Sequence, residues 1–506
     1  MADMIEGLNM LLNFQTMFWI VVGSILGIVL GALPGLTATM GVALMLPVSF
    51  YLPVATGMAL LLAVYAGAVA GASIPAILLG IPGNPNALAT VEDGYRMTRE
   101  GRGGLALGSA AVASLIGGVL SLIVLSLFAP MLARATLAFG PAEKFGLAVL
   151  GLAVIASIAS GNLLRGVGMA ALGLCLSLIG ADTFTNAPRM PFPDLLSRTP
   201  LANGIELIPA LIGLFGVSQA LVDLERLRTP VPPIPSVQVR DLFPSFRKLR
   251  QMWRIILEST GIGTLIGAIP GTGASIAVFL AHERAKKLTH APGSKLDKVG
   301  EGNIEGVFAP EVANNAVTGG ALIPVLTLGI PGDAVTAVLL GALLVKGVVP
   351  GNLLFVDNLP LVYAIFFGMG FALIAMFVFQ LVGVRLFPHV LRVPGMYLVP
   401  VVLVLSFVGT FAVDGQAVVK ATYNMGIALS LGAVGYLLKK ADYPISPLVL
   451  GLILGPMLED NYRLAVKLGQ GNHLIFLHSP IVMGMLAVVV LAVLWPILAR
   501  RSGSRA

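Results

Sequence analysis

Charged residues are scarce in this sequence. Its 506 residues include only 31 Lys and Arg and 24 Asp and Glu, a charged share of 11%, where soluble globular proteins have about 25%. Residues 7–91 contain none at all. A water-soluble fold of this size needs more charge to cover its surface, so we predict a polytopic membrane protein. The same composition excludes a soluble enzyme, a nucleic-acid-binding protein and a disordered chain.

Cysteine is also nearly absent, because Cys175 is the only one. This excludes an internal disulfide framework and a cysteine-based metal site. The five histidines are scattered and form no His-x-x-x-His pair, so we expect no metal cofactor. The first six residues carry two acidic side chains and no basic one. We therefore expect the first apolar segment to be retained and not cleaved as a signal peptide.

Long apolar runs take the place of charge. Uncharged stretches recur at 103–133, 145–164, 259–281, 312–332, 358–384, 393–413, 421–438 and 468–499. Most are near the roughly 20 residues that a membrane helix needs, and they are too continuous for the alternating strands of a membrane β-barrel. The sequence therefore predicts an all-α fold with about 10 to 14 hydrophobic segments.

The basic residues gather in three regions. Residues 223–254 contain seven basic and three acidic residues, 283–301 contain five and three, and Arg500, Arg501 and Arg505 lie in the C-terminal tail. Contact with lipid headgroups explains such clusters, and the positive-inside rule places all three on the cytoplasmic side. Prolines recur at 230–235, which we interpret as a stiff linker near the middle of the chain.

The sequence contains an internal repeat. The pentapeptide GALPG at 31–35 returns as GAIPG at 267–271, and the segment 71–83 returns at 320–332 with nine of 13 positions identical. Pro and Gly coincide at fixed spacing, so chance is a poor explanation. We predict a first transport repeat at 1–222, a basic cytoplasmic linker at 223–254, a second transport repeat at 255–470, and a C-terminal helix with a basic tail at 471–506.

The charge distribution also predicts the direction of the repeats. A cytoplasmic linker and an N-terminus without positive charge make the two repeats run in opposite directions, the inverted-repeat plan of secondary transporters. The segment 255–282 lies between two basic regions, and its Pro-Gly centre favours a re-entrant hairpin over two short spans. Irregular backbone at membrane depth is tolerated beside a cavity, so we expect 31–39 and 267–275 to line one.

Small hydroxyl and amide residues, Asn86 among them, cluster at these Pro-Gly breaks. Helix N-termini exposed at such breaks attract anions, and free carbonyl groups at helix C-termini coordinate Na⁺. The alternative is that the small residues only permit close helix packing. The residues that we predict to bind substrate or ion are Pro34, Gly35, Thr37, Thr39, Ser73, Pro82, Gly83, Asn84, Pro270, Gly271, Thr272, Ser275, Glu311, Asn314, Asn315, Thr327, Pro331, Gly332 and Asp333.

Two of these residues are carboxylates, which need a reason to lie in a membrane. Glu311 and Asp333 are candidates for a cation-binding or proton-carrying group, and a helix cap is the alternative for Asp333. Two enzymatic interpretations fail. The segment 267–273 lacks the Lys-Ser/Thr of a phosphate-binding loop, and 329–333 has no evident partner aspartate for an intramembrane protease. We predict that the protein is not an enzyme.

Five longer stretches carry a family resemblance: 31–46, the IPGNP stretch at 81–85 followed by Asp93-Gly-Tyr95, 305–315, 326–332 and 447–459. Together they resemble the large membrane subunit of the tripartite tricarboxylate transporter family, over residues 18–470. One departure is visible, because Ile81 and Asn84 stand where many relatives carry a polar residue and a Thr. This departure leaves the substrate open.

The resemblance implies a partner set and a mechanism. Such subunits work with a small four-helix membrane subunit and a periplasmic solute-binding protein, in the inner membrane of bacteria. They import tri- or dicarboxylates such as citrate, driven by a Na⁺ or H⁺ gradient and not by ATP. The family is similar to elevator-type transporters, in which two re-entrant hairpins hold the substrate; the Pro-Gly motifs and 311–315 would form that site. From the residues alone, a passive channel and a non-transporting structural subunit stay open.

Overall fold

The computed structural model describes residues 1–158, 163–189, 199–225, 242–270, 273–392, 395–412 and 418–502. Within these ranges six helices are long and apolar enough to cross a membrane, and five further apolar helices are shorter. One small antiparallel sheet pairs β1 (Gly180–Ala181) with β2 (Pro188–Arg189). The prediction of an all-α polytopic membrane protein is confirmed. The proline-rich part of the predicted linker lies outside the described residues.

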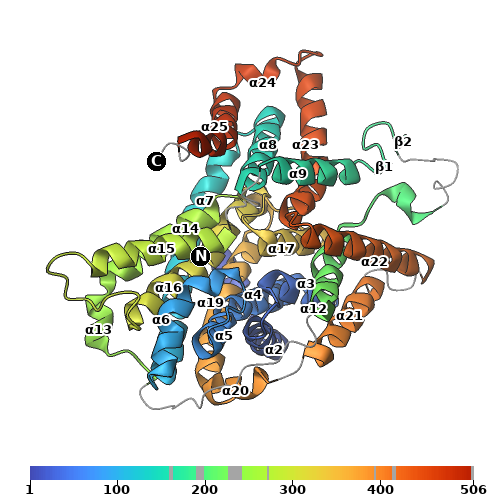
Figure 1. The fold of residues 1–506 in the computed structure, drawn as a ribbon. Coiled ribbons are helices and arrows are strands. Elements are labelled where there is room, and N and C mark those ends of the chain that lie inside the picture. The colour runs from blue at the N-terminus through green and yellow to red at the C-terminus, as the bar shows by residue number, and fades with distance from the viewer. Residues whose placement is uncertain are drawn as a thin grey trace. The chain divides into compact units, whose positions relative to one another are not determined.

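The chain forms two compact units, and each takes segments from both predicted repeats. Unit 1 comprises 1–133, 223–269 and 273–404, and unit 2 comprises 134–222, 270–272 and 405–506. The helices of unit 1 are α1 (Ala2–Asn9), α2 (Phe14–Ala32), α3 (Ala38–Phe50), α4 (Val54–Gly71), α5 (Ser73–Leu79), η1 (Pro85–Ala87), α6 (Leu88–Arg99), most of α7 (Gly103–Thr136), α13 (Phe246–Gln251), α14 (Trp253–Ala268), α15 (Gly273–Thr289), α16 (Ile304–Leu328), α17 (Ala334–Val345), α18 (Leu354–Asp357), α19 (Leu359–Val382), η4 (Gly383–Arg385), α20 (Phe387–Val390) and the start of α21 (Gly395–Ala412) (Figure 1).

The two sequence repeats form the same succession of helices inside unit 1. In the first, α2 ends at Ala32 and α3 begins at Ala38; in the second, α14 ends at Ala268 and α15 begins at Gly273. Both interruptions fall on the Pro-Gly breaks, because Pro lacks the N–H that a continuing helix would use. The helices α4 and α5 of the first repeat correspond to the single helix α16 of the second.

Glycines bring α2 close to α4 in the first repeat and α14 close to α16 in the second. A side chain at Gly27 of α2 would come within 2.5 Å of the Val64 carbonyl oxygen in α4. A side chain at Gly267 of α14 would come within 2.7 Å of the Val317 carbonyl oxygen in α16. Such close backbone approach is the packing that small residues permit between membrane helices. Around these pairs, α19 packs against α4, and α6 and α15 pack against α16.

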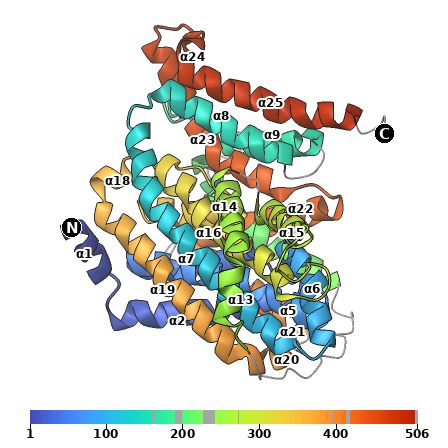
Figure 2. The same ribbon diagram turned by 90° about the vertical axis from the view of Figure 1, so that its left-hand side faces the viewer.

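Unit 2 is also helical. Its elements are the end of α7, α8 (Pro141–Ile158), α9 (Leu163–Ser177), β1, β2, η2 (Pro200–Asn203), α11 (Leu207–Leu211), the π-helix η3 (Ile212–Val217), most of α12 (Ser218–Glu225), the end of α21, α22 (Val418–Lys440), α23 (Ile445–Leu468), α24 (Ile475–His478) and α25 (Pro480–Ser502). Helix α23 packs against α8 and α9, and α25 runs alongside α8 (Figure 2). Asp182, Arg189, Glu459 and Arg463 form a closed ion-pair network that fastens the β1–β2 hairpin to α23.

Candidate functional site

The helices α5 and α16, which correspond in the two repeats, end in the same turn. Gly80 ends α5 and Gly329 ends α16, both in the left-handed conformation with a φ of 69°. In each turn the next N–H reaches back to a proline carbonyl, from Ile81 to Pro75 at 3.4 Å and from Ile330 to Pro324 at 3.3 Å. Glycine adopts this conformation without a steric penalty, which explains why it occupies both positions.

The glycine that closes each turn touches the Pro-Gly break of the same repeat. A side chain at Gly83 would come within 2.6 Å of the Gly31 carbonyl oxygen, and one at Gly332 would come within 2.6 Å of the Gly267 carbonyl oxygen. The two sequence motifs of each repeat are therefore in contact, with the same glycine pairing in both. A larger residue at Gly83 or Gly332 would therefore force the turn away from the first or second break.

Hydrogen bonds hold the first break to its turn and join the two repeats. Within the first repeat, the Gly35 N–H donates to the Gly83 carbonyl at 3.3 Å. Between the repeats, the Ser275 hydroxyl donates to Asn86 Oδ1 at 2.7 Å, which links the start of α15 to η1. The reciprocal pair, α3 and α17, is also in contact. The start of α15 thus packs against η1 of the first repeat, while α3, which corresponds to α15, packs against α17 of the second repeat.

Four helix segments begin around these loops, and polar side chains cap three of them. Thr37 Oγ1 accepts the Met40 N–H at 3.3 Å, and Asn84 Oδ1 accepts the Asn86 N–H at 3.0 Å. Asp333 Oδ1 accepts the Thr336 N–H at 2.7 Å, which completes a capping box at the start of α17. The helix-cap alternative for Asp333 is thus the arrangement found. The fourth start, Gly273 of α15, has a positive φ of 70°.

The structure places the predicted residues at different depths. Gly271 and Thr272 lie outside the described residues. Pro34 is exposed; Gly35, Thr37, Pro82, Pro270, Ser275 and Asp333 are half-buried; Thr39, Ser73, Gly83, Asn84, Glu311, Asn314, Asn315, Thr327, Pro331 and Gly332 are buried. The Ser73 and Thr327 hydroxyls donate to carbonyl groups of their own helical segments, Ala70 and Ile323, both at 2.7 Å. These two side chains therefore have a local structural partner.

Glu311 and its neighbours form a second, deeper polar group. Thr90 Oγ1 donates to Glu311 Oε1 at 2.6 Å, which joins α6 to α16. Asn314 Nδ2 donates to the Val69 carbonyl of α4 at 3.3 Å, and Asn315 Nδ2 donates to Ser114 Oγ of α7 at 2.8 Å. This group therefore connects α16 to three surrounding helices of unit 1.

Three polar side chains near these groups were not predicted from the sequence. Tyr65 is 1% exposed and donates its hydroxyl to Asp333 Oδ2 at 2.9 Å. Thr90 contacts Glu311, as described above. Asp223 lies beside the first break, where its Oδ1 would be 3.1 Å from a side chain at Gly35. Tyr65 lies within the uncharged run, and that position is the signal that could have drawn attention to it.

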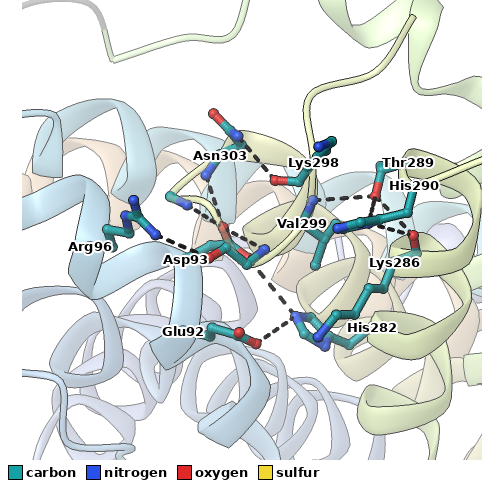
Figure 3. Close-up of polar contacts among 12 residues, drawn as sticks. Glu92, Asp93, Arg96, His282, Lys286, Thr289, His290, Lys298, Val299 and Asn303 are labelled. Carbon is teal, nitrogen blue, oxygen red and sulfur yellow. Dashed lines mark hydrogen bonds and ion pairs between the residues drawn. The ribbon is translucent and has the colours of Figure 1, made fainter. Parts of the chain in front are cut away.

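Asp93 anchors the loop that leads into α16 (Figure 3). Its carboxylate is fully buried and accepts backbone N–H groups of Gly300, Gly302 and Asn303 at 2.7–3.1 Å. Burial by itself would raise the pKa of Asp93, but the His282 imidazole and the three backbone N–H groups outweigh it and hold the pKa below the ordinary 3.8. A side chain at Gly306 would collide with this carboxylate. Asp93 and Gly306, which both lie in stretches that carry the family resemblance, thus belong to one structural joint.

Comparisons with known proteins agree with these motifs. The family model of the tripartite tricarboxylate transporter TctA family matches residues 17–450. An Agrobacterium vitis protein described as "Uncharacterized 52.8 kDa protein in TAR-I ttuC' 3'region" is 33% identical over 99% of this chain and 98% of its own length. A second Agrobacterium vitis protein, "Uncharacterized protein in TAR-II ttuC' 3'region", is 30% identical over 47% of this chain and 97% of its own length. No solved structure matches the chain.

The family model covers most of the chain, and its range includes all four repeated motifs and the Glu311 group. This family is a transporter family, and its members are the large subunits of tripartite transporters. The apolar helices and the family together make this a multi-pass membrane protein. The chain belongs to the tripartite tricarboxylate transporter TctA family.

Proposed function

We propose that this chain is the transmembrane transport subunit of a binding-protein-dependent secondary transporter that imports tri- or dicarboxylates, citrate among them. Import is coupled to Na⁺ or H⁺. The chain works in the inner membrane of a bacterium with a small four-helix membrane subunit and a periplasmic solute-binding protein. The family membership supports the class of transporter, and the loops of unit 1 support the kind of substrate.

The observation that carries the proposal is the convergence of both Pro-Gly breaks with the repeated turns. The contact of Gly35 with Gly83 joins the first break to the turn of its own repeat, and the contact of Ser275 with Asn86 brings the start of α15 from the second repeat to the same turn. Helix starts carry free N–H groups and a partial positive charge, which favour a carboxylate without a fixed cation. A polyanion held by neutral donors is released more readily than one held by arginine forks, as a transport cycle requires.

The exchange of partners between the repeats supports an inverted-repeat, elevator-like arrangement. In that arrangement the two breaks are the tips of re-entrant hairpins around a site at membrane depth. Irregular backbone is tolerated there only inside protein or beside water, which is consistent with the half-buried Gly35, Thr37 and Ser275.

Uptake of radiolabelled citrate into vesicles that contain the chain and its two partner subunits tests the proposal. Ser275→Ala removes the bond to Asn86 and should lower the rate of uptake several-fold while the protein level stays unchanged. Thr422→Ala is the control, because Thr422 lies on α22 of unit 2 and its hydroxyl bonds only within that helix. Equal rates for Ser275→Ala and the wild type would remove this contact from the site. No carboxylate uptake under any gradient would refute the function itself.

A further inference from the structure

Glu311 is a carboxylate without a full set of partners. It is 0% exposed and lies near the start of α16, where Thr90 donates a hydrogen bond to its Oε1 and the Asn314 amide also faces the carboxyl group. Its other oxygen, Oε2, is buried and has no hydrogen-bond partner. A carboxylate that is ionised in such surroundings carries a large desolvation penalty, and neutral donors without a cation do not offset it.

No opposite charge faces Glu311 among the described residues. The helices packed around α16 carry titratable groups, and among the described residues none of these forms an ion pair with Glu311. Tyr65 of α4 donates to Asp333, Glu92 and Asp93 of α6 face His282 of α15, Glu258 of α14 pairs with Arg284, and the part of α7 within unit 1 has no titratable side chain. The charge on an ionised Glu311 would therefore be uncompensated.

The adjacent polar groups leave several acceptors without a donor. The amide nitrogen of Asn314 donates to the Val69 carbonyl, and that of Asn315 donates to Ser114 and to the Glu311 backbone carbonyl. Their oxygens are buried and unpartnered, as is Glu311 Oε2. Asn314 interacts with the Glu311 carboxyl group from one turn along the helix. A proton on Oε2 would turn one of these acceptors into a donor, and it would remove the charge as well.

The same helix contains a natural comparison. Glu305 is also 0% exposed, but Lys248 Nζ lies 2.6 Å from its Oε1, which also accepts the Asp297 N–H at 2.9 Å. Both glutamates leave Oε2 without a hydrogen-bond partner, but Glu305 has a cation beside it and Glu311 has none. In the first repeat, the position equivalent to Glu311 is Leu62. Only the second repeat therefore has a carboxylate at this position.

We propose that Glu311 binds the proton that drives transport. In this step Oε2 of the carboxylate takes H⁺ from water on one side of the membrane, which forms the neutral acid and an O–H donor. Loss of the same H⁺ on the other side restores the carboxylate. The inference rests on the proposed function and deepens it, because it selects H⁺ over Na⁺ and assigns the group that carries it.

Infrared difference spectroscopy of the purified full chain tests proton binding without any transport. The carbonyl stretch of a protonated, buried carboxylic acid should be present in the wild type near neutral pH and absent in Glu311→Gln. Glu305→Gln is the matched control and should leave that band unchanged. A wild-type spectrum without the band, or a band that Glu305→Gln removes and Glu311→Gln keeps, would overturn the assignment.

Transport by the reconstituted complex tests coupling. A pH gradient should drive citrate accumulation in the wild type, by about tenfold for each coupled proton per pH unit. Glu311→Gln should lose this accumulation but keep citrate exchange across the membrane, which also shows that the variant folds. Glu311→Asp, which restores a titratable group, should recover part of the accumulation. Accumulation driven by Na⁺ alone, or undiminished in Glu311→Gln, would refute the inference and leave carboxylate transport standing. Absence of uptake by the wild type would refute the proposed function, while the infrared result would still decide proton binding.

Discussion

Replacing Asp93 with Asn should destabilise the joint between α6 and the loop before α16. Asn keeps one carbonyl oxygen, which can still accept the Gly300 N–H as Asp93 Oδ1 does at 3.1 Å. Its amide group, however, replaces Oδ2, which accepts the same N–H at 2.9 Å, and puts two donors against each other. The bonds to Gly302 and Asn303 change from charge-assisted to neutral, which weakens each by about half. Loss of the charge-assisted bond to Oδ2 costs about 1–3 kcal/mol and the weaker bonds about 0.5–1 kcal/mol each, for a total of about 2–5 kcal/mol.

The free energy of unfolding of the purified chain in detergent is measured by urea titration. Glu92→Gln is the control, since Glu92 is the preceding residue on the same helix and its side chain is 50% exposed. It should change stability by less than about 0.5 kcal/mol. If Asp93→Asn were as stable as Glu92→Gln, the carboxylate would not be holding the loop and the anchoring explanation would be wrong.

The pH dependence of stability gives the same prediction an independent check. The folded-state pKa of Asp93 lies below its ordinary 3.8. A group whose pKa is lowered by folding stabilises the fold above the unfolded pKa and loses that contribution as the pH falls through the folded pKa. The stability difference between the wild type and Asp93→Asn should therefore be constant near neutral pH and shrink below about pH 4. A difference that grew on acidification would contradict the assigned sign.

Three further predictions concern packing and pairing. Gly332→Ala should destabilise the protein by about 1–3 kcal/mol, because its side chain would lie 2.6 Å from the Gly267 carbonyl oxygen. Gly261→Ala is the control, since a side chain there would have no atom within 4 Å. Equal unfolding midpoints for the two variants would contradict the account. Lys248→Met should cost about 2–3 kcal/mol of unfolding free energy, since it leaves the buried Glu305 without a cation, and Glu305→Gln in the same protein should restore part of it. Tyr65→Phe should cost about 0.5–1.5 kcal/mol through the lost bond to Asp333, and no change in unfolding would show that this bond contributes nothing to stability.

The sequence predicted the features of the fold that depend on local chemistry. Both Pro-Gly breaks separate helices where expected, since a missing N–H and a flexible glycine act within a few residues. The repeat seen in the sequence is also present in the backbone, where Gly80 and Gly329 have the same φ. The two compact units could not be predicted from the sequence, because each combines segments from both repeats. Repeat boundaries follow chain order, whereas packing follows which helix faces are buried together.

The candidate site could be predicted only in part. Glu311 was noticed because a carboxylate in an apolar run is conspicuous, but its partner Thr90 is 221 residues away in the sequence. Tyr65 and Asp333 are 268 residues apart, and nothing in either local pattern pairs them. Asp93 was noticed only as part of a family motif. Its role as the anchor of the loop before α16 comes from three backbone N–H groups more than 200 residues later in the sequence. Side-chain pairing between distant helices depends on the packed fold and not on periodicity.

The central claim is that this chain moves carboxylates against a gradient by coupling them to an ion. Its most direct test is the uptake of radiolabelled citrate and other tri- and dicarboxylates by vesicles that contain the chain with its membrane partner, supplied with the solute-binding protein. The account predicts accumulation of a carboxylate only when all three proteins and an ion gradient are present. Uptake that only equilibrates and persists without a gradient would mean a passive channel, and no carboxylate uptake in any condition would contradict the account.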